Sequence, residues 1–220
     1  IPCRVFGTIK LKFNKMTTTT NLNELGKQIH ENAKAKGFWD EPRNTGEIFM
    51  LIVSELSEAL EADRKGRVAD MDMFQSRYSQ RNGVRSTEML AFIYAFENEV
   101  KDTVEDEIAD VVIRILGYCA VQKIDADFER FDDLDSESHT KNVGEYLISI
   151  TGSVYYASVS ARALDFKENE DDRDNLTLEI HEALAKLFGF AESQGFDLCQ
   201  HIQLKMKYNA TREHKHGKKY

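Results

Sequence analysis

Proline is almost absent from this chain, and that scarcity constrains its fold more than any other feature. The only prolines are Pro2 and Pro42, and none follows from Arg43 to the end. Because proline breaks the interior of a helix, its absence permits long helices over the rest of the chain. Apolar residues also recur there at helical spacing. We therefore expect an all-α fold, a helical bundle that carries an inserted helical hairpin.

The expected helices follow from this periodicity and from the glycines and polar residues between them. They run from Asn21 to Lys36, Glu47 to Lys65, Glu88 to Lys123 (one helix or two), Val143 to Phe166, Leu176 to Gln194 and Phe196 to Glu213. Gly66 and Gly195 are placed to end two of them. The segments expected between them are a loop at 37–46, a loop or insertion at 67–87, an acidic connector at 124–139 and a solvated charge run at 167–175.

The length of 220 residues fits a single domain. We assign that domain to 21–220, with insertions near 67–87 and 132–180, and leave 1–20 as an extension of unknown role. Nothing approaches about eighteen consecutive apolar residues, so no membrane span is expected. Three scattered cysteines give no disulfide framework, so Cys119 and Cys199 are expected as buried thiols in a reducing compartment, the cytoplasm.

The net charge of −9 argues against nucleic-acid binding. The charge is uneven, because from His201 onward six lysines and arginines face Glu213 alone, a net of +5. Lys205, Asn209 and Arg212 fall at i, i+4 and i+7, on one side of the last expected helix. Such a line suits a polyphosphate, because arginine grips phosphate with two hydrogen bonds and lysine adds a point charge. A disordered arm or a solvated helix end is the alternative.

Two acidic pairs carry the candidate chemistry. Glu55 and Glu58 are three residues apart, as are Glu107 and Asp110, so each pair can aim two carboxylates at one point. Glu55 falls within the apolar stripe of its helix, and Glu58 and Glu107 lie at stripe margins. A carboxylate that points toward a core is costly unless it is paired or bound to metal. Glu61 points away and is expected to be solvated.

Four convergent carboxylates suit a hard cation, Mg²⁺ where phosphates complete the coordination, with Mn²⁺ as a substitute. Glu105 also maps onto the apolar stripe, either as a first-turn acid that suits the helix dipole or as an extra ligand. An ordinary pair of acidic helices bridged to lysines and arginines is the plain alternative. A di-iron site would want Glu-x-x-His repeats, and the only such spacing, Glu213 to His216, lies in the basic tail.

These motifs resemble the MazG-like branch of the all-α nucleoside triphosphate pyrophosphohydrolases. The resemblance rests on GFWDEPRN, GEIFMLIVSELSEALEADRKGR, DEIADVVIRIL and HIQLKMKYNATREHKHGKKY, which stand in family order. The family motif is EExxE followed by ExxD. Ser54 replaces the first acid, and the other positions match the four acids of the two pairs. The gap between the halves is longer than usual, and 143–180 has no counterpart.

The resemblance implies a fold of that family's type and Mg²⁺-dependent hydrolysis of a (deoxy)nucleoside triphosphate to the monophosphate and pyrophosphate. Glu55, Glu58, Glu107 and Asp110 would hold the metal, with Glu58, beside Glu55, orienting or deprotonating the water. The substrate-binding residues would be Phe38 and Trp39 on the base and Lys205, Asn209 and Arg212 on the phosphates. It also implies a homodimer or dimer of dimers, for which Leu147, Ile150, Val154 and Ala157 offer a weakly charged helix face.

Two other functions stay open. One is a dUTPase-like member of the same superfamily, which a side-by-side assay of dUTP and dCTP would separate. The other is a non-catalytic helical binding or assembly module whose acids are structural. In that case Mg²⁺ would change neither the thermal stability of the protein nor the level of any nucleotide.

Overall fold

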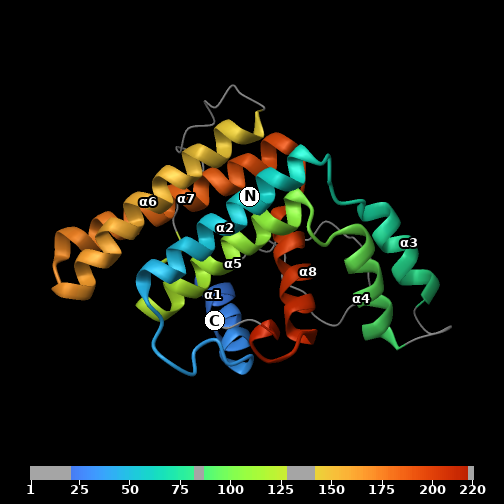
Figure 1. The fold of residues 1–220 in the computed structure, drawn as a ribbon, viewed down its shortest axis with the longest axis horizontal. Helices are drawn as coiled ribbons and strands as arrows, with labels where there is room; N and C mark the ends of the chain where they lie inside the picture. The colour runs from blue at the N-terminus through green and yellow to red at the C-terminus, as the bar shows by residue number, and fades with distance from the viewer. Residues whose placement is uncertain (1–20, 82–86, 128–141, 218–220) are drawn as a thin grey trace.

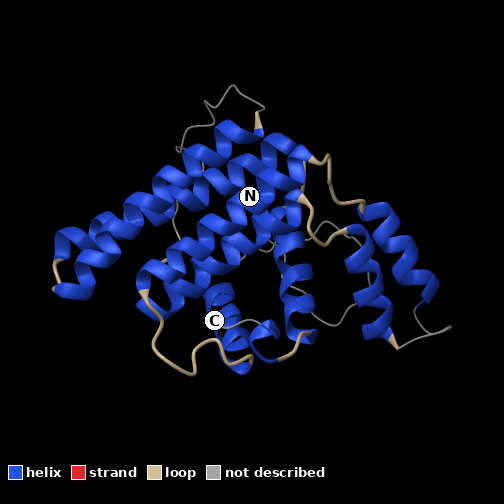
Figure 2. Cartoon of the chain, viewed as in Figure 1, coloured by secondary structure: helices blue, strands red, loops and turns tan. Residues whose placement is uncertain are grey.

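The computed structural model describes residues 21–81, 87–127 and 142–217, and the regular structure in them is helical (Figure 2). The expected all-α fold is thereby confirmed. The helices are α1 (Leu22–Ala35), α2 (Thr45–Arg64), α3 (Met71–Arg81), α4 (Glu88–Glu99), α5 (Val104–Gln122), α6 (Val143–Phe166), α7 (Glu170–Gln194) and α8 (Leu198–Thr211), then a 3₁₀ turn, η1 (His214–Gly217). The extension 1–20 and most of the acidic connector lie outside the described residues.

Polar caps set where most of these helices begin. The side chains of Asn21, Asn44 and Asn142 each accept a hydrogen bond from a backbone N–H three residues on, at the start of α1, α2 and α6. Such caps satisfy donors that the first helical turn leaves unpaired. At the other end of α7, Gly195 adopts φ +81°, the left-handed conformation that glycine tolerates best. The expected stop at Gly195 is confirmed.

Two expected loops are partly helical. Within 67–87, α3 forms because Phe74 and Tyr78, one turn apart, are buried against α4, and Asp70 caps the helix by accepting from the N–H of Met73 at 2.8 Å. Two apolar residues are too few to reveal a helical period. The charge run 167–175 is solvated as expected, but α7 already begins at Glu170, where acidic residues suit the positive end of the helix dipole.

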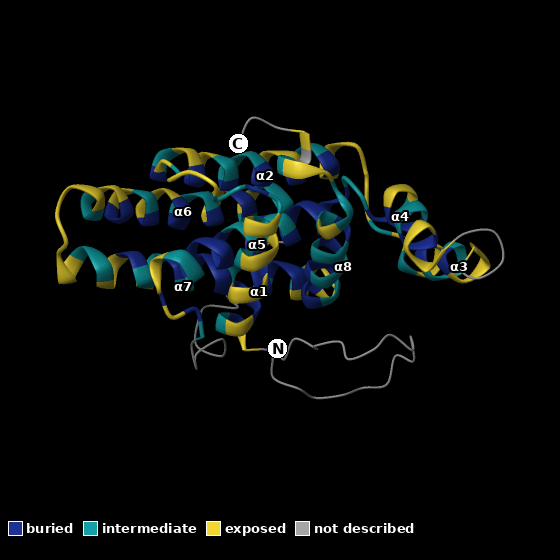
Figure 3. Ribbon diagram, turned by 90° about the horizontal axis from the view of Figure 1, so that it is seen from below, coloured by how far each residue is buried: buried dark blue, intermediate teal, exposed yellow. Residues whose placement is uncertain are grey.

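The large hydrophobic core surrounds α5. Helices α1, α2 and α8 pack directly on α5, and the α6–α7 hairpin covers α2 and one end of α5 (Figure 1). Figure 3 shows the buried faces of these helices turned toward one another. Because α5 is enclosed on several sides, its first turn is buried although that turn is acidic. This enclosure brings carboxylates into the interior.

The hairpin α6–α7 belongs to the same core. Leu147, Ile150, Val154 and Ala157 on α6 are all buried within the chain. They therefore do not form the exposed face on which a dimer was expected from the sequence. A different row of apolar side chains on α6 faces solvent, namely Ile148, Tyr155, Val159 and Phe166.

Helices α3 and α4 stand apart from the main bundle (Figures 1 and 3). They build a smaller aromatic core of their own, which Tyr208 of α8 joins. The Tyr208 ring stacks on Phe96 with 4.5 Å between centroids, and its hydroxyl donates to Glu97 at 2.9 Å. One tyrosine on α8 thus links the small core to the wall of the site described below.

The cysteine predictions hold in part. Cys119 is a buried free thiol, as expected, whereas Cys199 is disulfide-bonded, so the prediction of a thiol there is wrong. The cysteines therefore no longer support a reducing compartment, and the cytoplasm stays a prediction. Within 21–81, 87–127 and 142–217, every helix is too short or too polar to cross a membrane.

Candidate metal and nucleotide site

A cavity of about 260 Å³ opens between α1, the loop that follows it, α2, α5 and α8. Every residue that was predicted to bind metal or substrate lines it: Phe38, Trp39, Glu55, Glu58, Glu107, Asp110, Lys205, Asn209 and Arg212. These residues come from four separate stretches of the chain, and the folding of α2 and α8 against α5 brings them together. Their distances and contacts indicate which of them could bind a metal or a nucleotide.

Three of the four predicted metal ligands converge. Glu55, Glu58 and Glu107 each offer a carboxylate oxygen, and these oxygens lie within 4.8 Å of one another. The side chains of Glu55 and Glu107 are buried, while Glu58 is exposed at the edge of the group. Such a set of oxygens, closed on the protein side and open on the other, has the donor chemistry that a hard divalent cation requires.

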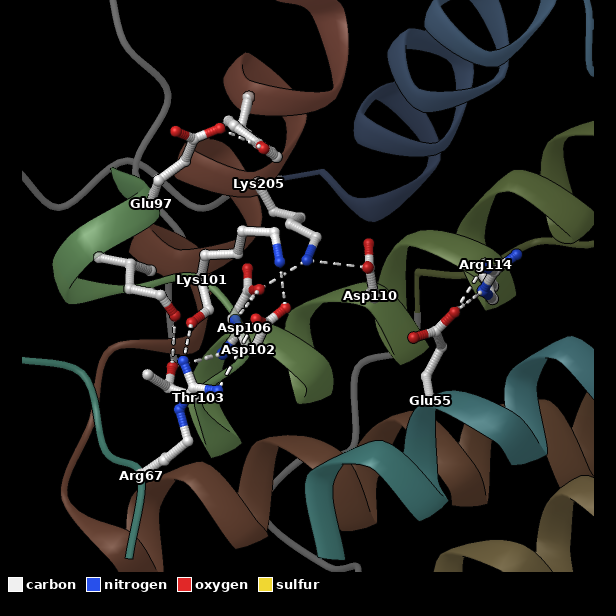
Figure 4. Close-up of polar contacts among 12 residues, drawn as sticks. Glu55, Arg67, Glu97, Lys101, Asp102, Thr103, Asp106, Asp110, Arg114 and Lys205 are labelled. Carbon is white, nitrogen blue, oxygen red and sulfur yellow. Dashed lines mark hydrogen bonds and ion pairs between the residues drawn. The ribbon is translucent and has the colours of Figure 1, made fainter. Parts of the chain in front are cut away.

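Glu55 is held by an arginine that the sequence analysis did not single out. Both Nε and a terminal nitrogen of Arg114 donate to the same oxygen, Oε1 of Glu55, the former at 2.8 Å (Figure 4). Burial raises the pKa of Glu55, and Arg114 opposes that shift. Because both donors use Oε1, the arginine orients the carboxylate and leaves Oε2 for a ligand in the cavity.

Asp110, the fourth predicted ligand, is engaged elsewhere. The ammonium of Lys205 lies 2.9 Å from Oδ2 of Asp110 and 2.6 Å from Oδ2 of Asp106. In Figure 4, Asp110 lies between Lys205 and the Glu55–Arg114 pair. Asp110 lines the cavity, but it is not in the group of three that a metal could bridge directly.

Lys205 is therefore a buried counter-ion in this structure. Burial alone would lower its pKa, but the carboxylates of Asp110, Asp106 and Glu107 raise it overall. Burial raises the pKa of Asp106 to about 6, and Lys205 opposes that rise. The lysine thus carries a positive charge that acidic side chains already neutralise. The expected role of Lys205, a charge held out to a phosphate, is not the one that its contacts show.

Glu107 makes no ion pair with any described residue. It is 4% exposed, and burial raises its pKa to about 9; Lys205 lowers the value, and Asp106, Asp110 and Glu55 raise it. A carboxyl in this position is poorly stabilised as an anion by the protein alone. A divalent cation on the neighbouring oxygens would supply the missing positive charge.

The other end of the cavity is aromatic and apolar. Trp39 packs edge-on against the ring of His30 at 5.3 Å, and the guanidinium of Arg43 lies 5.6 Å from the Trp39 ring centroid. Phe38, Ile48 and Ile113 also line the cavity. The cavity therefore joins a carboxylate cluster to a surface on which a flat aromatic ligand could lie.

The basic tail is folded back over this cavity as far as Gly217. Helix α8 ends at Thr211, so Arg212 is extended and does not continue the helical line of Lys205 and Asn209, as the spacing had suggested. Lys36 donates to the carbonyl of Arg212 at 2.5 Å, and the N–H of Lys215 donates to the carbonyl of Lys36 at 2.7 Å. The reading of the tail as a disordered arm is wrong for this part.

The sequence analysis missed two residues of the site, Arg43 and Arg114. Arg43 and Arg114 line the cavity, and only the i+4 spacing from Asp110 to Arg114 could have drawn attention to one of them. Glu105, one of whose two expected roles was an extra metal ligand, instead accepts from the N–H of Ala69 at 3.0 Å. It fixes the chain between α2 and α3 and does not face the acidic group.

Comparison with known proteins identifies no relative. The chain matches no protein-family model, no curated protein and no solved structure. Support for a function therefore comes from the motifs of the sequence and from the contents of this cavity.

Proposed function

We propose that this protein hydrolyses a (deoxy)nucleoside triphosphate between the α and β phosphates, releasing the monophosphate and pyrophosphate, with Mg²⁺ as cofactor and Mn²⁺ as a substitute. One observation carries the proposal. A cluster of three carboxylates, an indole ring and an arginine of the basic tail line a single cavity. These are the groups needed for a metal, a base and a phosphate chain respectively.

The residues present fit Mg²⁺. Glu55, Glu58 and Glu107 provide only oxygen donors, and Oε2 of Glu55 and both oxygens of Glu107 are not taken by a described donor. Glu107 has no counter-ion among the described residues, and a bound cation would compensate its charge. When bound there, Mg²⁺ would polarise the phosphates and lower the pKa of a coordinated water.

The side chains then have separate tasks. Glu58, the exposed acid of the group, orients the attacking water and takes its proton, with Glu55 beside it. Arg114 holds Glu55 in place through Oε1. Arg212 at the cavity wall stabilises the charge that builds on the leaving pyrophosphate, and Asn209 adds a polar contact. Trp39 and Phe38 cover the base, and their closure over it excludes water from the apolar end.

The test is a panel of ribo- and deoxyribonucleoside triphosphates with Mg²⁺, including dUTP and dCTP, with products separated. We expect monophosphate and pyrophosphate, and a loss of kcat on the order of a hundredfold or more for Glu58→Gln, the size of a general-base effect. Glu61→Gln is the matched control. It lies one turn further along α2 and pairs with Arg64 and Lys65 on the surface, so its activity should be normal.

The same panel separates the other functions. Preference for dUTP alone would favour the dUTPase-like reading. Release of diphosphate and inorganic phosphate would place the cleavage at another bond and contradict the proposal. No turnover of any nucleotide, together with no effect of Mg²⁺ on the melting temperature, would leave the helical binding or assembly module.

A further inference from the structure

Arg43 carries a charge that the described residues compensate only in part. One of its terminal nitrogens is buried and has no hydrogen-bond partner, and the residue makes no ion pair with another described residue. A buried donor without an acceptor costs about 1–3 kcal/mol, and more when it is charged. Most buried polar groups in native proteins are paired with protein, water or a bound ion or ligand, so this donor calls for a partner from outside the described residues. Arg43 lies in the loop before α2 and lines the same cavity as the acids.

A second guanidinium makes the position of Arg43 still less favourable. Burial lowers the pKa of Arg43, the nearby charge of Arg114 lowers it further, and Glu47 gives only a partial compensation. Arg114 is itself bound to Glu55, so its charge is directed toward the metal end of the cavity. Of the two neighbouring guanidinium groups, only Arg114 has a carboxylate bound to it, so one more anion would balance the remaining positive charge.

Neighbouring side chains also restrict the position of the Arg43 guanidinium. Its guanidinium lies 5.6 Å from the ring centroid of Trp39, a contact of the cation–π type, which keeps the side chain against the aromatic wall. Arg114, which is bound to Glu55, is close enough for its charge to act on Arg43. Arg43 therefore neighbours both the aromatic wall and the arginine that holds the acidic group.

We infer that Arg43 binds a phosphoryl oxygen of the substrate, at the junction between the base and the metal-bound part of the phosphate chain. The inference rests on the proposed function, because it names a contact within the same site. Arginine suits the role, since its planar fork can donate two hydrogen bonds to one phosphate.

An anionic ligand fits better than a neutral base edge. A carbonyl oxygen of a nucleobase would satisfy the unpaired donor of Arg43, but it would not offset the repulsion between Arg43 and Arg114. A phosphate does both, because it accepts the hydrogen bond and places negative charge between the two cations. A finding that Arg43 hydrogen-bonds to the nucleobase and not to phosphate would therefore contradict the inference.

Trp39 provides a direct probe, because it is the only tryptophan in the chain and lies beside Arg43. Inorganic tripolyphosphate and an unphosphorylated nucleoside would each be titrated into the protein without metal, with Trp39 emission as the signal and calorimetry as a second measurement. For Arg43→Gln we expect weaker binding of tripolyphosphate, on the order of tenfold to a hundredfold. Nucleoside binding should be unchanged, and Arg43→Lys should recover part of the loss.

Arg64→Gln is the control for general charge, since Arg64 lies at the other end of α2 and pairs with Glu61 on the surface. A further measurement, the affinity for Mn²⁺ alone, should be the same in wild type and in Arg43→Gln. Circular dichroism would show whether Arg43→Gln is folded. If it is not, the comparison of tripolyphosphate binding between wild type and Arg43→Lys tests the inference instead.

The inference is overturned if tripolyphosphate binds Arg43→Gln as tightly as wild type, if it does not bind the wild type, or if the variant loses nucleoside binding instead. Failure of the proposed function looks different. In that case the wild type binds tripolyphosphate, and Arg43→Gln weakens it, but no nucleotide is cleaved. The two failures therefore give separate patterns.

Discussion

The acidic group contains both compensated and uncompensated carboxyls. Lys205 reaches Asp106 at 2.6 Å and Asp110 at 2.9 Å, whereas Glu107 has no direct cationic partner among the described residues. The lysine therefore occupies the place of a cation on one side of the acidic group. The side formed with Glu55 and Glu58 remains for a metal.

The first prediction concerns the pH dependence of stability. The folded pKa of Glu107, about 9, lies above its value of 4.5 in an exposed setting, so the folded state binds the proton more tightly. Stability without metal should therefore fall as the pH rises from about 4.5 toward 9. Mg²⁺ competes with that proton, so its stabilising effect should grow over the same range.

Melting temperatures measured with and without Mg²⁺ at several pH values from 6 to about 9 would test this. Glu107→Gln should be more stable than wild type at the alkaline end in the absence of metal, and it should lose most of the Mg²⁺ effect. A Mg²⁺ effect that is the same at every pH would contradict this role of Glu107.

Lys205 and Arg212 should separate stability from activity. Lys205→Met leaves the buried Asp106 and the partly buried Asp110 without a counter-ion. Breaking a buried pair such as Lys205–Asp106 costs about 3–5 kcal/mol. Arg212→Met removes a half-buried cation that is tied to the fold through its backbone. Its unfolding free energy should change by less than about 0.5 kcal/mol. Its kcat/KM should fall on the order of a hundredfold.

Chemical denaturation and steady-state kinetics on the same two variants give the measurement. Equal losses of stability in both would show that Arg212 is structural. A Lys205→Met variant as stable as wild type would show that the charges of Asp106 and Asp110 are neutralised in some other way.

At the scale of elements, α1 and α5, which both line the cavity, approach each other closely. A methyl group on Gly26 of α1 would lie 2.9 Å from the carbonyl oxygen of Leu116 on α5. A backbone oxygen at that distance cannot yield without moving a helix. The close contact also explains why Ile29 of α1 and Gly117 of α5 both reach the cavity wall.

Gly26→Ala should therefore be destabilising, although alanine favours helix by about 1 kcal/mol. Overpacking costs about 1–3 kcal/mol, and the helices must part. Gly152→Ala is the control, because it lies within α6 with nothing within 4 Å of the added methyl group. That variant should be stabilised by about 0.5–1 kcal/mol. Denaturation curves that show the same sign for both would contradict the close approach of α1 and α5.

At the scale of the whole molecule, the exposed apolar row on α6 is the surface best suited to assembly among the described residues. Ile148, Tyr155, Val159 and Phe166 are spaced by seven, four and seven residues and so share one helix face. A row of exposed apolar side chains on one helix face is a candidate interaction site. The face is distinct from the buried one that the sequence suggested.

The predicted homodimer, or dimer of dimers, should therefore depend on this face. Light scattering at micromolar concentration should give a dimer or tetramer for wild type and a smaller species for the double variant Ile148→Lys, Val159→Lys. Met50→Lys is the control, since Met50 on α2 is similarly exposed. A monomeric wild type would refute the assembly, and a double variant that assembles normally would move the interface elsewhere.

The sequence by itself determined most of the helices and that two of the predicted acids, Glu55 and Glu107, face inward. Periodicity and caps are local properties, so α1, α2 and α6 begin and end within two residues of the predicted bounds. The same periodicity put Glu55 and Glu107 next to apolar stripes, and both are buried. Helix α3 escaped prediction because its period shows in only two large side chains.

Only the tertiary structure determined which charged side chains form ion pairs with one another. From their spacing, Lys205 and Arg212 were both predicted to bind phosphate. The packing of α8 on α5 instead places Lys205 against Asp106 and Asp110. The pairing of Arg114 with Glu55 joins residues 59 positions apart. Such contacts depend on the angles and distances at which helices cross, and a local helical pattern does not record them. The unpaired charge of Arg43 likewise exists only because folding buries it beside Arg114.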